Sequence, residues 1–165
     1  MPLLQSFCEW LENSPLGMFI SGSTWAFPTI ESIHVFFLVI VVGTIAIVDL
    51  RLLGVASRNH KVSQLSNDVL PLTWGAFVGA LVTGSLLFSS KATHYLANWP
   101  FKLKMGLLLL AGLNMLLFHF LTYRDVKRWD DDPVTPQAAR LAGFLSLTFW
   151  IGVVAFGRWI GFTVR

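Results

Sequence analysis

Four long apolar stretches constrain this chain more than any other feature of its sequence. They cover residues 28–50, 70–89, 101–123 and 141–163, and each is bounded by charged residues or by proline. A helix needs roughly 20 apolar residues to cross a hydrocarbon core of about 30 Å. Only 13% of the residues are charged, whereas soluble domains carry about 25%. The sequence therefore predicts an all-α integral membrane protein, a four-helix bundle that forms a single domain over residues 1–165.

Prolines and a short amphipathic segment mark the expected ends of these helices. Pro28, Pro71 and Pro100 lie at the starts of the first three stretches, where a missing N–H costs a helix nothing. Residues 1–13 place apolar side chains at helical spacing, with Gln5, Glu9 and Glu12 between them. This pattern predicts a short N-terminal helix that lies in the membrane interface.

The charges exclude some partners and indicate an orientation. A net charge of +3 from dispersed residues is too weak a signal for nucleic-acid binding. The lone Cys8 excludes an internal disulfide and a thiolate cluster within the chain. Lys and Arg are modestly more frequent between stretches one and two and between three and four, so the positive-inside rule places both termini on the outer side of the membrane. Residues 124–140 read as a solvated loop on the inner side.

Ionisable residues inside an apolar stretch are costly and need a partner or a purpose. At 1.5 Å per residue, His34 lies about 9 Å, and Lys104 and Arg158 about 5–8 Å, below the outer ends of their helices. His94, in the outer loop, can fold down onto the same place. His119 lies on the order of 20 Å from the height of His34. The depths therefore indicate one outer site, formed by three or four segments.

Haem b fits the chemistry of that site. Its iron takes an imidazole, and its propionates favour Arg or Lys at the interface. We expect His34 as one axial ligand, Lys104 or His94 as the other, and Arg158 and Lys102 near the propionates. The simpler interpretations are a neutral His34 bonded to a neighbouring helix, lysines that reach the headgroups, and an ion pair between Arg158 and Glu31.

The second stretch has a face almost without side chains. Small residues recur on it at a spacing near four: Gly75, Ala76, Gly79, Ala80 and Gly84. In membranes such faces usually let helices approach closely. A flat macrocycle can also lie against a face without large side chains, so the sequence leaves both interpretations open.

The expected function is one-electron transfer between the quinone pool and a periplasmic partner. One alternative is copper transport, with His34, His94, Lys104 and His119 as candidate metal ligands, although Cu(I) favours softer residues. Histidines toward the inner side also allow a second haem or a copper ion. The other alternative is a cofactor-free accessory subunit of a larger membrane complex or of a homo-oligomer, which packs through its glycine faces.

Several motifs carry a resemblance to known families: ESIHV at 31–35, VDLRLLG at 48–54, FKLKM at 101–105, AGLNMLLFH at 111–119 and GRWI at 157–160. Together they resemble an uncharacterised bacterial family of small four-span inner-membrane proteins. More distantly, the chain looks like the haem-containing membrane protoporphyrinogen oxidases and the copper-resistance membrane proteins of the D type. A histidine and a lysine are implicated in haem binding in those oxidases, and this resemblance points to His34 and Lys104.

Overall fold

A computed structural model describes residues 2–56, 60–130 and 134–163 of the chain. The helices in these ranges are α1 (Pro2–Glu12), α2 (Pro15–Gly22), α3 (Ala26–Leu52), α4 (Val62–Ser90), α5 (Ala92–Ala97), α6 (Trp99–Leu117), α7 (Val126–Trp129) and α8 (Gln137–Thr163). Four helical segments of the described chain are long and apolar enough to cross a membrane: α3, α4, α8 and the continuous segment Trp99–Asp125 that begins with α6. The all-α bundle and its four spans are confirmed.

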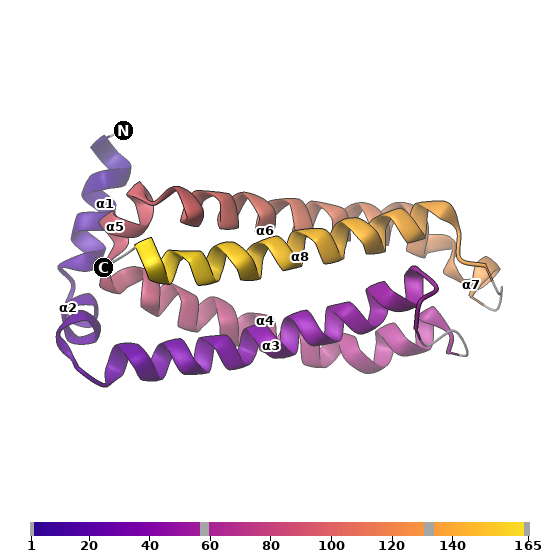
Figure 1. Cartoon of the computed structure of the whole chain (residues 1–165), viewed down its shortest axis with the longest axis horizontal. Helices are drawn as coiled ribbons and strands as arrows, with labels where there is room; N and C mark the ends of the chain where they lie inside the picture. The colour runs from indigo at the N-terminus through magenta and orange to yellow at the C-terminus, as the bar shows by residue number, and fades with distance from the viewer. Residues whose placement is uncertain (1, 57–59, 131–133, 164–165) are drawn as a thin grey trace.

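The four long helices run side by side along the molecule (Figure 1). α3 packs along α4, α6 packs along α8, and a contact between α3 and α8 joins the two pairs. All four contribute to one core at mid-length, which consists of Val41, Ala76, Ala111, Trp150 and Val153. Many large apolar side chains on the outer faces are exposed. A lipid environment requires this arrangement, because the bilayer covers those faces.

One expected helix start is wrong. α4 begins at Val62, eight residues before the apolar stretch, and Pro71 lies inside the helix instead of opening it. Proline leaves the carbonyl four residues earlier without its N–H partner. That carbonyl belongs to Asn67, which is exposed. We infer that water or headgroups at the membrane surface can satisfy it, so the polar residues 62–69 extend the helix beyond the hydrocarbon.

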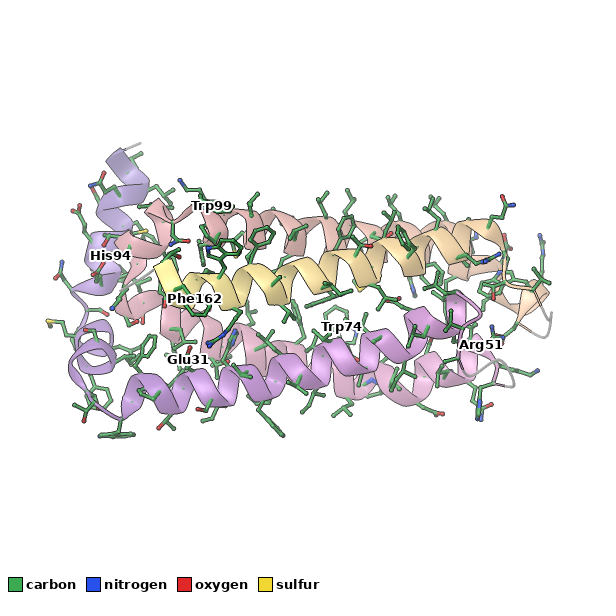
Figure 2. The ribbon with its side chains drawn as sticks, in the orientation of Figure 1. Glu31, Arg51, Trp74, His94, Trp99 and Phe162 are labelled. Carbon is green, nitrogen blue, oxygen red and sulfur yellow. The ribbon has the colours of Figure 1, made fainter. Side chains whose placement is uncertain are left out.

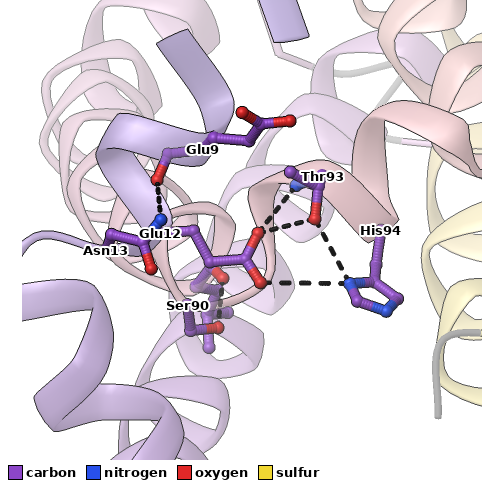
Figure 3. Close-up of polar contacts among 7 residues, drawn as sticks. Glu9, Glu12, Asn13, Ser90, Thr93 and His94 are labelled. Carbon is purple, nitrogen blue, oxygen red and sulfur yellow. Dashed lines mark hydrogen bonds and ion pairs between the residues drawn. The ribbon is translucent and has the colours of Figure 1, made fainter. Parts of the chain in front are cut away.

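Three short helices cover the end of the bundle that carries both termini, which we call the N-terminal end. α1 lies across this end, as Figure 1 shows, so the predicted N-terminal helix is confirmed. The Glu12 carboxylate accepts hydrogen bonds from the backbone N–H (3.1 Å) and the hydroxyl (2.6 Å) of Thr93, which joins α1 to α5 (Figure 3). The sequence did not predict α2, which begins after a Ser14 cap and Pro15, or α5.

The opposite end, which we call the loop end, is packed more tightly than the sequence indicated. Trp129, Asp130 and Thr135 are buried, so this part of the 124–140 segment is not a solvated loop. Asp130 accepts hydrogen bonds from the backbone N–H and the hydroxyl of Ser63 at the start of α4. A carboxylate there satisfies free N–H groups and favours the positive end of the helix dipole. The charged residues of this segment predicted a solvated loop, whereas the start of α4 supplies Asp130 with a buried partner.

Candidate functional site

His34 is held by a hydrogen bond between α3 and α4. Its Nδ1 lies 2.9 Å from Oγ1 of Thr83, and this hydroxyl lies 2.7 Å from the carbonyl oxygen of Gly79. A hydroxyl has a single hydrogen. If Thr83 donates that hydrogen to Gly79, its oxygen accepts one from Nδ1–H. We therefore assign the tautomer in which Nδ1 carries the proton and Nε2 keeps its lone pair.

Side chains of α3 lie over two glycines of the small-residue face of α4. A Cβ built on Gly79 would lie 2.6–2.7 Å from three ring carbons of Phe37, and one on Gly84 would lie 3.1 Å from Cε1 of His34. These glycines therefore let α3 approach closely and give two of its rings a place. The Phe37 ring therefore occupies the position at Gly79, while the interpretation of the whole face as a slot for a macrocycle stays a prediction.

Lys104 approaches His34 from the other helix pair. Its side chain is half-buried and passes over Gly157 of α8, where a Cβ would lie 3.7 Å from Nζ. Within the described ranges, no hydrogen bond or ion pair of this ammonium group is found, yet it interacts electrostatically with the His34 imidazole. An imidazole and an amine from different helix pairs are thus within electrostatic reach of each other, and each lies over a glycine of its neighbouring helix.

The two other predicted cations are exposed. Arg158 places its guanidinium 5.0 Å from the centroid of the Phe162 ring, and Lys102 extends outward from the first turns of α6. No ion pair joins Arg158 to Glu31 in the part of the chain that the structure describes. Figure 2 shows Glu31 and Phe162 toward the N-terminal end of the bundle. Both cations therefore remain accessible to an anionic group at this end.

Tyr95 on α5 adds a phenol to this end of the molecule. Its ring lies with Phe88 and Phe101 in one aromatic cluster, with centroids 5.5–6.1 Å apart. Burial raises the pKa of Tyr95, and the negative charge of Glu31 raises it further. Glu31 is therefore close enough to act on the phenol. The sequence did suggest that the segment with Tyr95 can fold toward the outer site.

His94 and His119 lie away from this arrangement. His94 is exposed, and its Nδ1 lies 4.0 Å from a carboxylate oxygen of Glu12 (Figure 3). His119 lies in a π-helical turn, Phe118–Thr122, toward the loop end, where its ring stacks on Tyr123 at 5.4 Å. No group of three or more His, Cys, Asp and Glu side chains that could hold a metal is found among the described residues. The assignment of either histidine as a ligand stays a prediction.

Two residues of the site were not singled out from the sequence. Thr83 fixes the imidazole, and its only sequence signal is its position four residues after Gly79, on the small-residue face. Gly157 and Gly161 form a Gly-x-x-x-Gly pattern, whose usual meaning is close helix packing. Gly157 makes room for Lys104 because of the side that α6 turns toward α8. Periodicity alone does not show which side this is.

The fold and these polar residues define a class: a four-span α-helical membrane protein with an ionisable site near one end of its bundle. Within that class, the chain belongs to a family of unknown function, DUF6644, whose sequence pattern matches residues 7–163. No curated protein and no solved structure matches the chain. The expected membership of an uncharacterised four-span family is thereby supported. The comparisons give no support to a likeness to the oxidases or the copper-resistance proteins.

Proposed function

We propose that the protein binds haem b at the N-terminal end of the bundle and carries single electrons. The observation that carries this proposal is the state of His34. Its Nδ1 is engaged by Thr83, no partner of Nε2 is found among the described residues, and the Lys104 amine of the opposite helix pair lies within electrostatic reach of the ring. Histidines that bind metals are usually fixed in this way, through a hydrogen bond to the other ring nitrogen.

The donor set fits the cofactor. Haem iron takes nitrogen ligands, and a deprotonated lysine amine can serve beside an imidazole. Arg158 and Lys102 are accessible cations for the two propionates, as bidentate and single-point donors respectively. Because the Phe37 ring lies over Gly79, haem would not reach that position. Haem would therefore bind on the side of His34 that carries Nε2. Bound haem would supply a reversible one-electron carrier, while the chain orients the imidazole and holds the charges.

Both termini of this membrane protein lie at the N-terminal end of the bundle (Figure 1). We place this end in the periplasm of a bacterial inner membrane, because the Lys and Arg counts favour it. Electrons would then pass between the quinone pool and a periplasmic redox protein. The half-buried Tyr95 and the exposed Trp99 lie on the segments at this end, where a membrane-dissolved donor and a soluble acceptor can both approach.

The test is an absorption spectrum of the detergent-purified protein, oxidised and reduced. We expect a Soret band that His34→Ala removes, and that Thr83→Val weakens through a roughly 10–100-fold loss of haem affinity. His119→Ala is the matched control and should leave the spectrum unchanged. Separate Lys104→Met and His94→Ala variants identify the second ligand, because only loss of that ligand changes the spin state.

Four outcomes contradict the proposal. A colourless protein after expression with sufficient haem excludes it, as does a Soret band that survives His34→Ala unchanged. Copper bound in place of haem, found by metal analysis, selects the transport alternative. A colourless chain that co-purifies with a stoichiometric membrane partner selects the accessory subunit.

A further inference from the structure

Asp49 is a buried carboxyl group toward the loop end of α3. The residue is only 5% exposed, and its Oδ2 is fully buried and has no hydrogen-bond partner among the residues that the structure describes. Ser146 on α8 lies close enough to donate a side-chain hydrogen bond to this carboxyl group. From the sequence, Asp49 stands next to the expected inner end of a span, where a carboxylate reaches water. The contact with α8 removes that water.

No positive charge compensates this carboxyl group within the described chain. Arg51, two residues later on α3, donates instead to the carbonyl of His60 (2.7 Å) and to the hydroxyl of Thr135 (3.3 Å). The ionisable residues of the neighbouring helices near this level, Asp68 on α4 and Arg140 on α8, are both exposed. A buried and unpaired carboxylate is costly enough that such a group neutralises instead.

The surroundings of Asp49 exclude a metal ion and leave the proton as the ligand. Hard cations take about six or more oxygen ligands. Among the residues that the structure describes, one carboxyl group and one hydroxyl are present here, and no cluster of acidic or histidine side chains surrounds them. A proton needs only the carboxyl oxygen itself, and the neutral acid can accept the Ser146 hydrogen bond.

Packing seals this position on two sides. Toward the N-terminal end lies the core that contains Val41 and Trp150, and toward the loop end lies a second cluster that contains Leu52 and Trp129. α8 also touches α3 directly, because a Cβ on Gly143 would lie 3.1 Å from the Asp49 carbonyl oxygen. The carboxyl group therefore exchanges its proton only when this contact loosens.

We propose that Asp49 is an intramembrane proton-binding site, held as the neutral acid between α3 and α8 and loaded from the loop end of the bundle. Asp49 lies three residues before the last residue of α3. It is fifteen residues from His34, or about 22 Å along the helix. Its proton therefore comes from the compartment at the loop end, and the site is separate from the one proposed to bind haem. Ionisable residues inside membrane proteins commonly serve proton transfer.

Infrared difference spectroscopy of the purified full-length protein tests this site. We expect a carboxylic-acid carbonyl band at neutral pH that shifts in D2O and is absent in Asp49→Asn. Asp125→Asn is the control, because Asp125 is an exposed carboxylate 3.8 Å from Arg128, and its removal should leave the acid band unchanged. His34→Ala should keep the band, which separates this result from the fate of the haem proposal. A wild-type spectrum without an acid band at neutral pH, or a band that Asp49→Asn retains, overturns the proposal.

A second variant tests the seal without removing the carboxyl group. Gly143→Ala places a methyl group against the backbone of Asp49 and should separate α8 from α3 locally. We expect faster exchange of the acid proton for deuterium than in the wild type. Gly112→Ala is the matched control, since a Cβ there meets nothing within 4 Å. Equal exchange in Gly143→Ala and the wild type would refute the sealing contact.

Discussion

The close contact between Phe37 and Gly79 makes a sharp prediction for the variant Gly79→Ala. The new methyl carbon would lie 2.6–2.7 Å from three carbons of the Phe37 ring. Optimal carbon–carbon separations are about 3.5–4.0 Å, so the ring or the helix must move by about 1 Å. The ring belongs to the layer packed against the core residue Val41, so this movement disturbs the α3–α4 interface.

The expected loss of stability follows from that overlap. Overpacking a well-packed core typically costs about 1–3 kcal/mol. For a chain of this size, the midpoint of thermal unfolding falls by about 2–4 °C per kcal/mol. We therefore expect Gly79→Ala to lower the Tm by roughly 2–12 °C. The loss arises although alanine favours a helix over glycine by up to about 1 kcal/mol, so the clash must exceed that gain.

Thermal unfolding in detergent, followed by circular dichroism, measures this loss. Gly75→Ala is the matched control one turn away on the same helix, because a Cβ there meets nothing within 4 Å. It should be neutral or slightly stabilising. In a double-mutant cycle, Phe37→Leu should relieve most of the loss caused by Gly79→Ala. Equal Tm values for Gly79→Ala and Gly75→Ala would refute the packing described here.

Two further predictions concern the ends of the bundle. Asp130→Ala removes the cap on the start of α4 and should cost about 1 kcal/mol of unfolding free energy. The control Asp125→Ala, at an exposed site, should cost much less. Similar losses of unfolding free energy in the two variants would contradict the capping role. In a Tyr123→Phe background, Tyr95 is the remaining tyrosine, and ultraviolet titration should show its phenol ionising above the ordinary pKa. Glu31→Gln should lower that pKa only in part, because burial is the larger cause; an unchanged titration would show that Glu31 does not act on the phenol.

Much of the fold follows from local sequence, and the predictions that were wrong have clear physical causes. The four spans were predictable because each apolar stretch is long enough to cross a bilayer. The start of α4 was not, since Pro71 is a usual helix opener and the polar residues before it carry no apolar signal. The burial of Asp130 was equally hidden, because its partner, the N-terminus of α4, lies 67 positions away in the sequence.

For the candidate site, the sequence indicated which polar residues share a depth and not which groups they contact. Depth along each helix indicated that His34 and Lys104 lie at a similar level, and the structure brings them within electrostatic reach. Depth says nothing of rotation about the helix axis. It could not show that Thr83 engages the imidazole, that Phe37 fills the position at Gly79, or that Asp49 turns toward α8.

The spans and their apolar surfaces were decided by composition along the chain, because backbone groups in hydrocarbon must bond within their own helix. Each apolar stretch therefore has to become a helix, whatever its neighbours are. Which side chain lies over each glycine, and which carboxyl group loses its water, depended on how α3, α4, α6 and α8 face one another. These contacts arise from close packing between helices. Rotating one helix by one residue position would exchange a buried group for an exposed one.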